Sequence, residues 1–243
     1  MKKAFILGLV SCVAFLSGGG AQAQTYSGSR AFDGVHKHEV SGYLLGGANV
    51  VSRGFGGEAA SYTYHFTDRW SIGAGEQAQF GKSLYCVGLT GTYRLPVSRY
   101  NLYFDARILS NVYTRWSMHE LAINASAYWE ASYFDMRLGL SYLHFLRYGK
   151  DTDAYVEPPM LTVGLGVNIR PRSNPWNIGL FIRNYDEYYY EIWNINYGIR
   201  FHATLPWQNL KLYGELNNRP AGNLSQLATY YEVSLKLGLK YAF

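Results

Sequence analysis

The sequence predicts an all-β protein, an antiparallel up-and-down transmembrane β-barrel of about 12 strands, with about 10 or 14 strands as the alternatives. Three observations predict this fold. The chain ends on a strictly alternating segment, "VSLKLGLKYAF", whose apolar residues all share one face of a strand. It begins with an export signal, and no later apolar run is long enough to cross a bilayer as a helix. Its composition is 17% aromatic, with 23 tyrosines and 26 glycines but only 16% charged residues, which is unusual for a globular protein.

The first residues have the pattern of a secretory signal peptide. Two lysines precede an apolar run that ends at Leu16, and small residues then lead to an A-x-A cleavage site at Ala21 and Ala23. We therefore expect residues 1–23 to be removed and residues 24–243 to form a single outer-membrane β-barrel domain. A lipoprotein box at Leu9–Cys12 is the competing interpretation, but the apolar segment before it would be very short.

Cysteine content and charge exclude two classes of protein. Cys86 is the one cysteine left after cleavage, so the mature chain contains no intramolecular disulfide. Removing the two signal lysines leaves 20 basic residues against 17 acidic ones, which lowers the net charge from +5 to about +3. This small excess indicates no nucleic-acid partner.

Period-two segments separated by turn residues recur along the mature chain. In one hairpin Tyr62 and Tyr64 alternate with polar residues, a turn follows at 67–69, and Trp70 begins the next segment. The expected strands are residues 38–48, 55–66, 70–80, 84–94, 101–112, 119–130, 134–145, 160–170, 176–184, 190–203, 208–217 and 229–243.

Short and longer connections alternate between these strands. Outer-membrane barrels keep their short turns at the periplasm, and an even strand count returns the C-terminus to that side. Four tryptophans, Trp70, Trp129, Trp176 and Trp207, lie beside the expected short turns, where we expect them to be membrane-interface aromatics. Glu76 opposes this pattern because it shares parity with Ile72 and Ala74, which would place it against lipid unless a bulge at 73–75 reverses its face.

The signal, the amphipathic segments and the terminal "KLGLKYAF" resemble the bacterial outer-membrane β-barrel class. The resemblance is architectural, covers the whole mature chain and names no particular family. It implies integral location in the bacterial outer membrane, contact with outer-membrane lipid and recognition of the last strand by the barrel assembly machinery. Tyr241 and the aromatic final residue Phe243 would then be the assembly signal.

Candidate catalytic and metal-binding residues are few. Barrel lipid hydrolases resemble one another in a His-x-Ser pair, and the nearest matches, His65 with Thr67 and His202 with Thr204, have threonine and lie at the periplasmic end. His36 and His38 share a face of an extended segment but have no further ligands nearby, so the sequence predicts no metal site and no cofactor.

The inward parity predicts a lumen with two kinds of wall. Early strands contribute neutral polar residues: Ser61, Thr63, Ser71, Gln77, Thr90 and Thr92. Later strands contribute charges: Asp105, Arg107, Asp135, Arg137, Arg170, Arg183, Arg200, Lys211, Glu215, Glu232, Lys236 and Lys240. These charges either pair across the interior and close it, or line a wet channel with a basic side.

The function favoured by this pattern is a passive, weakly anion-selective channel, whose partners would be small polar or anionic solutes. The alternatives are a structural or adhesive barrel with tyrosine-rich surface loops and a closed interior, and then a lipid-modifying barrel enzyme. The sequence indicates no oligomeric state.

Overall fold

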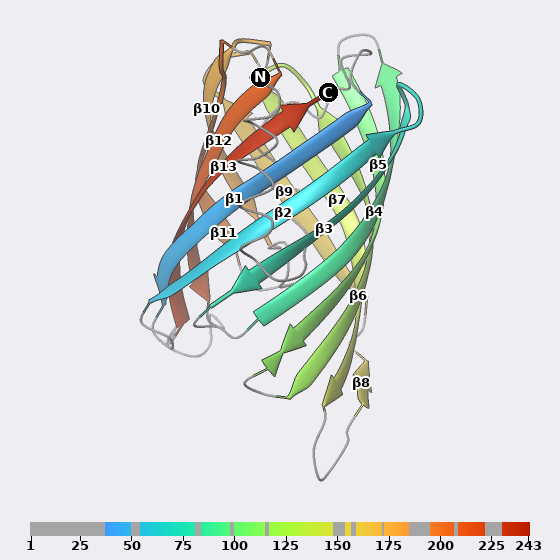
Figure 1. Cartoon of the computed structure of the whole chain (residues 1–243), viewed down its shortest axis with the longest axis vertical. Coiled ribbons are helices and arrows are strands. Elements are labelled where there is room, and N and C mark those ends of the chain that lie inside the picture. Colours follow the sequence, from blue (N-terminus) through green and yellow to red (C-terminus); the bar gives the residue numbers. More distant parts are fainter. Residues whose placement is uncertain are drawn as a thin grey trace, which may run out of the picture.

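Twelve antiparallel strands close into a barrel in the computed structural model (Figure 1). Strands pair with their neighbours in sequence, and the ring closes where β13 pairs with β1. A thirteenth, three-residue strand, β8, pairs only with the end of β7. The strands are β1 (His38–Asn49), β2 (Phe55–His65), β3 (Trp70–Gln79), β4 (Leu84–Val97), β5 (Tyr100–Tyr113), β6 (Met118–Glu130), β7 (Phe134–Arg147), β8 (Ala154–Val156), β9 (Met160–Asn168), β10 (Trp176–Arg183), β11 (Asn196–Thr204), β12 (Leu210–Ala221) and β13 (Tyr230–Ala242). The predicted barrel of twelve strands is confirmed.

The structure describes residues 37–49, 54–80, 84–97, 100–114, 117–147, 154–156, 159–171, 173–184, 195–206, 209–221 and 230–243. The expected signal peptide, residues 1–23, and Trp207 lie outside these ranges. In the described ranges no helix has the length and apolarity needed to cross a membrane.

The strands have an apolar outer face and a polar inner face. On β13, Leu235 and Leu237 point outward and are 43% and 46% exposed, whereas Ser234 and Lys236 point inward and are 3% exposed. The same alternation runs through β10, where Leu180 is exposed and Arg183 is buried. Soluble sheets bury their apolar face, so the reversed pattern requires an oily solvent around the barrel.

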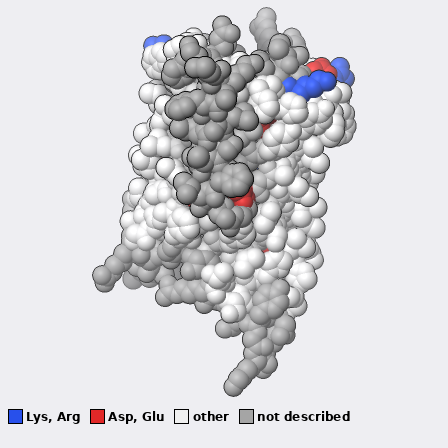
Figure 2. All heavy atoms as spheres, viewed as in Figure 1, with Lys and Arg blue, Asp and Glu red and all other residues white. Residues whose placement is uncertain are grey.

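One end of the barrel holds the short connections and the closing seam. The turn at 66–69 joins β2 to β3 there, and the end of β4 at Val97, the start of β5 at Tyr100 and the connection at 131–133 lie at the same end. At the seam the backbone N–H of His38 donates to Phe243 O at 2.9 Å, and the N–H of Phe243 donates to His38 O at 2.8 Å. We call this the periplasmic end. On the face in Figure 2, charged atoms gather mainly at the end where β13 finishes in Figure 1.

The expected interface aromatics point outward beside the short connections. The Trp70 ring lies 4.7 Å from that of Tyr93, and the Trp129 ring lies 5.6 Å from that of Tyr100. Trp176 is also outward and 44% exposed. These three positions are where indole rings reach the headgroups of a bilayer.

Glu76 lies on the outer face, so the suggested bulge is wrong. The β2–β3 register is uninterrupted, with Ser61 opposite Gly75 and Ala60 opposite Glu76. Glu58 on β2 shares this outward parity. The outer surface of β2 and β3 therefore carries two carboxylates among small apolar residues.

Candidate functional site

The polar inner face of the barrel is the candidate functional site. The structure places nine of the predicted lining residues on this face of their strands, and most of them are almost fully buried. They are Arg107, Arg137, Arg183, Arg200, Lys211, Glu215, Glu232, Lys236 and Lys240. The two lysines Lys211 and Lys240 lie opposite each other on β12 and β13, close to the periplasmic end.

Arg170 differs from its expected position. It lies in the connection after β9, is exposed, and its guanidinium carbon is 3.5 Å from the centroid of the Trp176 ring. β9 ends at Asn168, so the strand parity from which we predicted an inward Arg170 does not extend to this residue. Arg170 therefore packs on an interface tryptophan outside the lumen.

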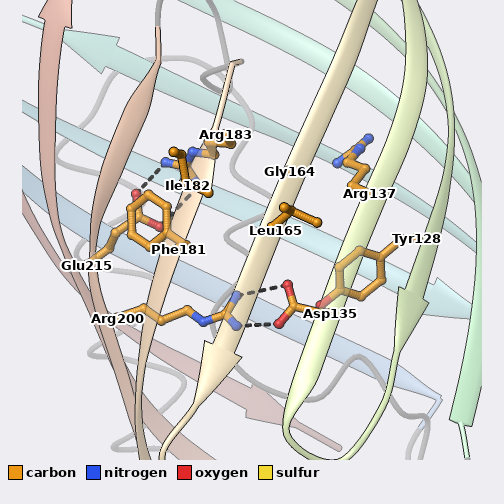
Figure 3. Close-up of a pocket in the computed structure, with 10 residues that line it drawn as sticks. All are labelled: Tyr128, Asp135, Arg137, Gly164, Leu165, Phe181, Ile182, Arg183, Arg200 and Glu215. Carbon is orange, nitrogen blue, oxygen red and sulfur yellow. Dashed lines mark hydrogen bonds and ion pairs between the residues drawn. The ribbon is translucent and has the colours of Figure 1, made fainter.

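An ion pair between Arg200 and Asp135 spans two intervening strands (Figure 3). Arg200 on β11 donates to both carboxylate oxygens of Asp135 on β7, and its Nη2 lies 3.3 Å from Asn168 Oδ1. The side chain passes over Gly166 on β9 and Gly179 on β10. A Cβ at Gly166 would lie 2.7 Å from Asp135 Oδ1, and one at Gly179 would lie 3.2 Å from Arg200 Nε. These two glycines therefore form a cradle in which Arg200 lies flat against the wall.

A second charged cluster joins β10, β12 and β13. Arg183 Nη2 donates to Glu215 Oε1 at 2.5 Å, and Lys236 Nζ lies 3.9 Å from the same oxygen. Arg183 also lies over the Phe181 ring, 4.5 Å from its centroid. One carboxylate thus interacts with two cations, so this part of the wall keeps a positive excess.

Arg137 organises a third cluster on β5–β7. Its Nη2 donates to Ser126 Oγ at 2.5 Å and lies 3.8 Å from Asp105 Oδ2. Thr92 donates to the other oxygen of Asp105 at 2.9 Å.

A small hollow lies between these clusters (Figure 3). Its lining includes Asp135, Arg137, Arg183, Arg200 and Glu215, and its volume of about 10 Å³ is room for roughly one water molecule. Three guanidinium groups and two carboxylates therefore meet at this level of the barrel.

Three lumen acids were missed by the sequence reasoning, among them Glu39 on β1, whose Oε1 lies 2.7 Å from Lys240 Nζ. Glu120 on β6 accepts hydrogen bonds from Asn111 Nδ2 and the Tyr113 hydroxyl, each at 2.8 Å. Glu130 on the same strand accepts one from the Tyr103 hydroxyl at 3.2 Å. The common parity of Glu120 and Glu130 in the segment 118–130 was the available signal.

The neutral wall, the inner face of β1–β4, is held mainly by uncharged groups, and its charged residues Glu39 and Arg94 lie near the periplasmic end. The Tyr43 hydroxyl donates to Gln77 Oε1 at 2.8 Å, and the hydroxyl oxygens of Ser41 and Ser61 are 2.7 Å apart. Thr90 on β4 is 1% exposed. The predicted neutral character of this wall agrees with the structure.

The inner face also holds an apolar cluster on β4–β7 and β9. It includes Leu84, Cys86, Leu109, Ala122 and Leu143, all at most 6% exposed. The sequence reasoning did not identify this cluster, because it followed polar residues along the inward parity.

The two histidine–threonine pairs lie at the periplasmic end of their strands, as the sequence predicts. Thr67 is a turn residue, whose Oγ1 accepts hydrogen bonds from the backbone N–H groups of Arg69 and Trp70. His202 and Thr204 lie near the periplasmic end of β11. Within the described residues no three His, Cys, Asp or Glu side chains are grouped as metal ligands would be.

Comparison with known proteins supports the fold. No protein-family model and no curated protein matches the chain. Among solved structures, the KdgM porin is similar with a TM-score of 0.54 and 10% identity, covering 84% of this chain and 99% of the other. The NanC porin has a TM-score of 0.51 and 12% identity, covering 83% and 99%. The translocator domain of the autotransporter NalP from Neisseria meningitidis has a TM-score of 0.51 and 11% identity, covering 99% and 96%.

This chain shares with these structures the fold of a bacterial outer-membrane β-barrel. Its outward apolar belt, with aromatic rings beside the short turns, fits an integral location in that membrane.

Proposed function

We propose that this protein is a passive outer-membrane channel for small polar solutes, with a weak preference for anions. One observation carries the proposal: the inner face of a twelve-strand barrel is lined by charged side chains drawn from β5–β7 and β10–β13. Two of the similar structures are described as porins and one as a translocator domain, so the fold alone does not choose the function.

Barrel width supports a passage. The interior of a barrel with about 8 strands is just filled by its own side chains, and diameter grows with strand number. Twelve strands therefore enclose more space than wall side chains need. The glycine cradle widens it further, because Arg200 lies along the wall instead of extending toward the axis.

The anion preference follows from the excess of bases on one side. The inner faces of β10–β13 carry Arg183, Arg200, Lys211, Arg219, Lys236 and Lys240, against the acids Glu215 and Glu232. We call this the basic wall. In a narrow lumen with low-dielectric surroundings, such an excess raises the local concentration of anions.

A closed structural or adhesive barrel is the second candidate, favoured by the burial of the lining. Arg183, Glu215 and Lys236 are 5%, 3% and 3% exposed, so the barrel is narrow at this level. A channel with this lining would be of low conductance, whereas a closed barrel would not conduct.

Assembly and anchoring are part of the same proposal. We infer that Tyr241 and Phe243 form the signal read by the barrel assembly machinery, supported by their outward position at the seam. Their rings stack with centroids 5.7 Å apart, and the Phe243 ring stacks on His38 at 5.3 Å.

Planar-bilayer recording on refolded protein distinguishes the two candidates. The channel predicts discrete conductance steps from protein whose heat-modifiable electrophoretic mobility shows a folded barrel. Folded protein that gives no steps would establish the closed barrel instead. Heat-denatured protein from the same preparation is the control for contaminating pores.

A further inference from the structure

The charges of the lumen are segregated by sign. The acidic sector, the inner face of β5–β7, carries Asp105, Glu120, Glu130 and Asp135, against the bases Arg107 and Arg137 among the side chains that the structure describes. The basic wall on β10–β13 has six bases and two acids. β9 separates the two on one side and β1–β4 separate them on the other. Near the periplasmic end these strands add one charge of each sign, Glu39 beside Lys240 and Arg94 beside Asn101.

The acids of this sector accept hydrogen bonds from neutral donors, and two of them also interact with arginines. Glu120 accepts from an amide and a phenol, Glu130 from a phenol, and Asp105 from the Thr92 hydroxyl. Asp105 also lies 3.8 Å from Arg137 Nη2, and Asp135 accepts from Arg200. With four acids against two bases among its described side chains, the sector has an acidic excess.

β9 marks the boundary between the two signs. Its inner face carries Gly164 and Gly166, and the Arg200–Asp135 pair crosses it from the basic wall to the acidic sector. The cation of this pair therefore comes from the basic wall and its anion from the acidic sector. It contributes to a field across the lumen.

We propose that this transverse field selects small zwitterionic solutes, those with an ammonium and a carboxylate held apart on one molecule. The inference rests on the proposed channel function and names its substrate class. A net ion is attracted by one wall and repelled by the other, and an uncharged solute gains little from either. A zwitterion presents its ammonium to the acidic sector and its carboxylate to the basic wall, and the gain increases with its charge separation.

Three isomeric solutes test the inference by liposome swelling. The first is ε-aminocaproate, with distant charges; the second is norleucine, with adjacent charges; the third is uncharged ε-hydroxycaproamide. We expect ε-aminocaproate to enter roughly 3-fold or more faster than the uncharged isomer, with norleucine between them. Equal rates for all three would overturn the inference and leave the channel standing, whereas no entry of any solute would overturn the channel itself.

Exchanging the two charges of the Arg200–Asp135 pair tests whether this pair contributes to the preference for zwitterions. Asp135→Arg with Arg200→Asp keeps the net charge and the pair across Gly166 but reverses its direction, so the advantage of ε-aminocaproate should shrink. Leu138→Ala with Ile199→Ala changes outward residues of the same two strands, 50% and 44% exposed, and should preserve it. An undiminished advantage in the exchanged protein would refute the field.

A second variant keeps the test decisive if the exchanged protein does not fold. Glu130→Gln with Lys236→Gln removes one charge of each sign and leaves the net charge unchanged. The advantage of ε-aminocaproate should again shrink, while entry of the uncharged isomer continues. Retention of the full advantage in this variant would likewise contradict the proposal.

Discussion

The neutral wall and the basic wall close the same barrel with different chemistry. On β1–β4 the buried polar groups are hydroxyls and amides, as in Tyr43 with Gln77. On β10–β13 they are guanidinium, ammonium and carboxylate groups, as in Arg183 with Glu215. Both walls form continuous antiparallel ladders. Closing the barrel therefore does not require charge, and burying charge has a desolvation cost that neutral groups avoid. We therefore propose that the basic wall acts on solutes that enter the lumen.

The seam between the two walls should be the most sensitive point. Deleting Phe243 removes both backbone hydrogen bonds to His38 and the ring stack on it. Because an open sheet edge in a bilayer leaves backbone groups unsatisfied, we expect loss of assembled protein. Heat-modifiable mobility of the membrane fraction measures this, with Phe243→Tyr as the aromatic control. If the truncated chain assembles normally, the contacts of Phe243 at the seam are not needed for assembly and Phe243 is not part of an assembly signal.

Removing one partner of a buried ion pair should lower the stability of the barrel more than removing a hydroxyl from the neutral wall. Asp135→Ala leaves Arg200 buried without its carboxylate and should lower the free energy of unfolding by about 3–5 kcal/mol. Ser61→Ala on the neutral wall removes one hydroxyl contact and should cost about 1 kcal/mol. Urea unfolding in lipid vesicles measures both. Similar losses at the two positions would mean that the charges are no more costly to disturb than neutral groups.

Moving charge to the outer face tests the orientation of the basic wall. Leu237 is adjacent to Lys236 but points to lipid, so Leu237→Arg should destabilise the barrel by roughly 2–4 kcal/mol near the membrane midplane. Leu237→Phe keeps the apolar surface and is the control. An arginine that is tolerated at this position as well as phenylalanine would show that water or protein covers the outside of β13.

Filling the glycine cradle should have the smallest effect on stability. Gly166→Ala places a methyl group against Asp135 and Arg200, and such overpacking should cost about 1–3 kcal/mol. Gly91→Ala on β4 is the matched control, since nothing lies within 4 Å of the added Cβ. The Gly166 variant should also conduct less, because its arginine is pushed from the wall. Unchanged stability and conductance would refute the cradle.

The strands and their faces were predictable because one physical rule determines both. Lipid outside and polar groups inside impose a period of two, which can be read in segments such as 233–243 without knowledge of their partners. The rule fails where a strand stops, as at Arg170, and where a strand is too short to show a period, as in β8. Parity alone correctly predicted that Glu76 faces outward. The bulge that we considered at 73–75 is absent.

The contacts of the site were not predictable from parity. Arg200 meets Asp135 because only β9 and β10 separate β11 from β7, in a particular register, and because Gly166 and Gly179 leave space. The sequence reasoning placed Asp135 on the inner face but did not pair it with Arg200. Contacts between side chains of distant strands depend on the register of those strands and on glycines that leave space. The alternation of apolar and polar residues shows neither.

The reversal potential across a KCl gradient tests most directly the claim that the basic wall lines a passage. The account predicts an anion-selective parent whose preference decreases at high salt, since salt screens the field of the wall. Arg183→Gln with Arg200→Gln keeps hydrogen-bond donors for Glu215 and Asp135 while removing two positive charges, and should shift the reversal potential toward cations. A cation-selective parent, or a double variant with unchanged selectivity, would contradict the account.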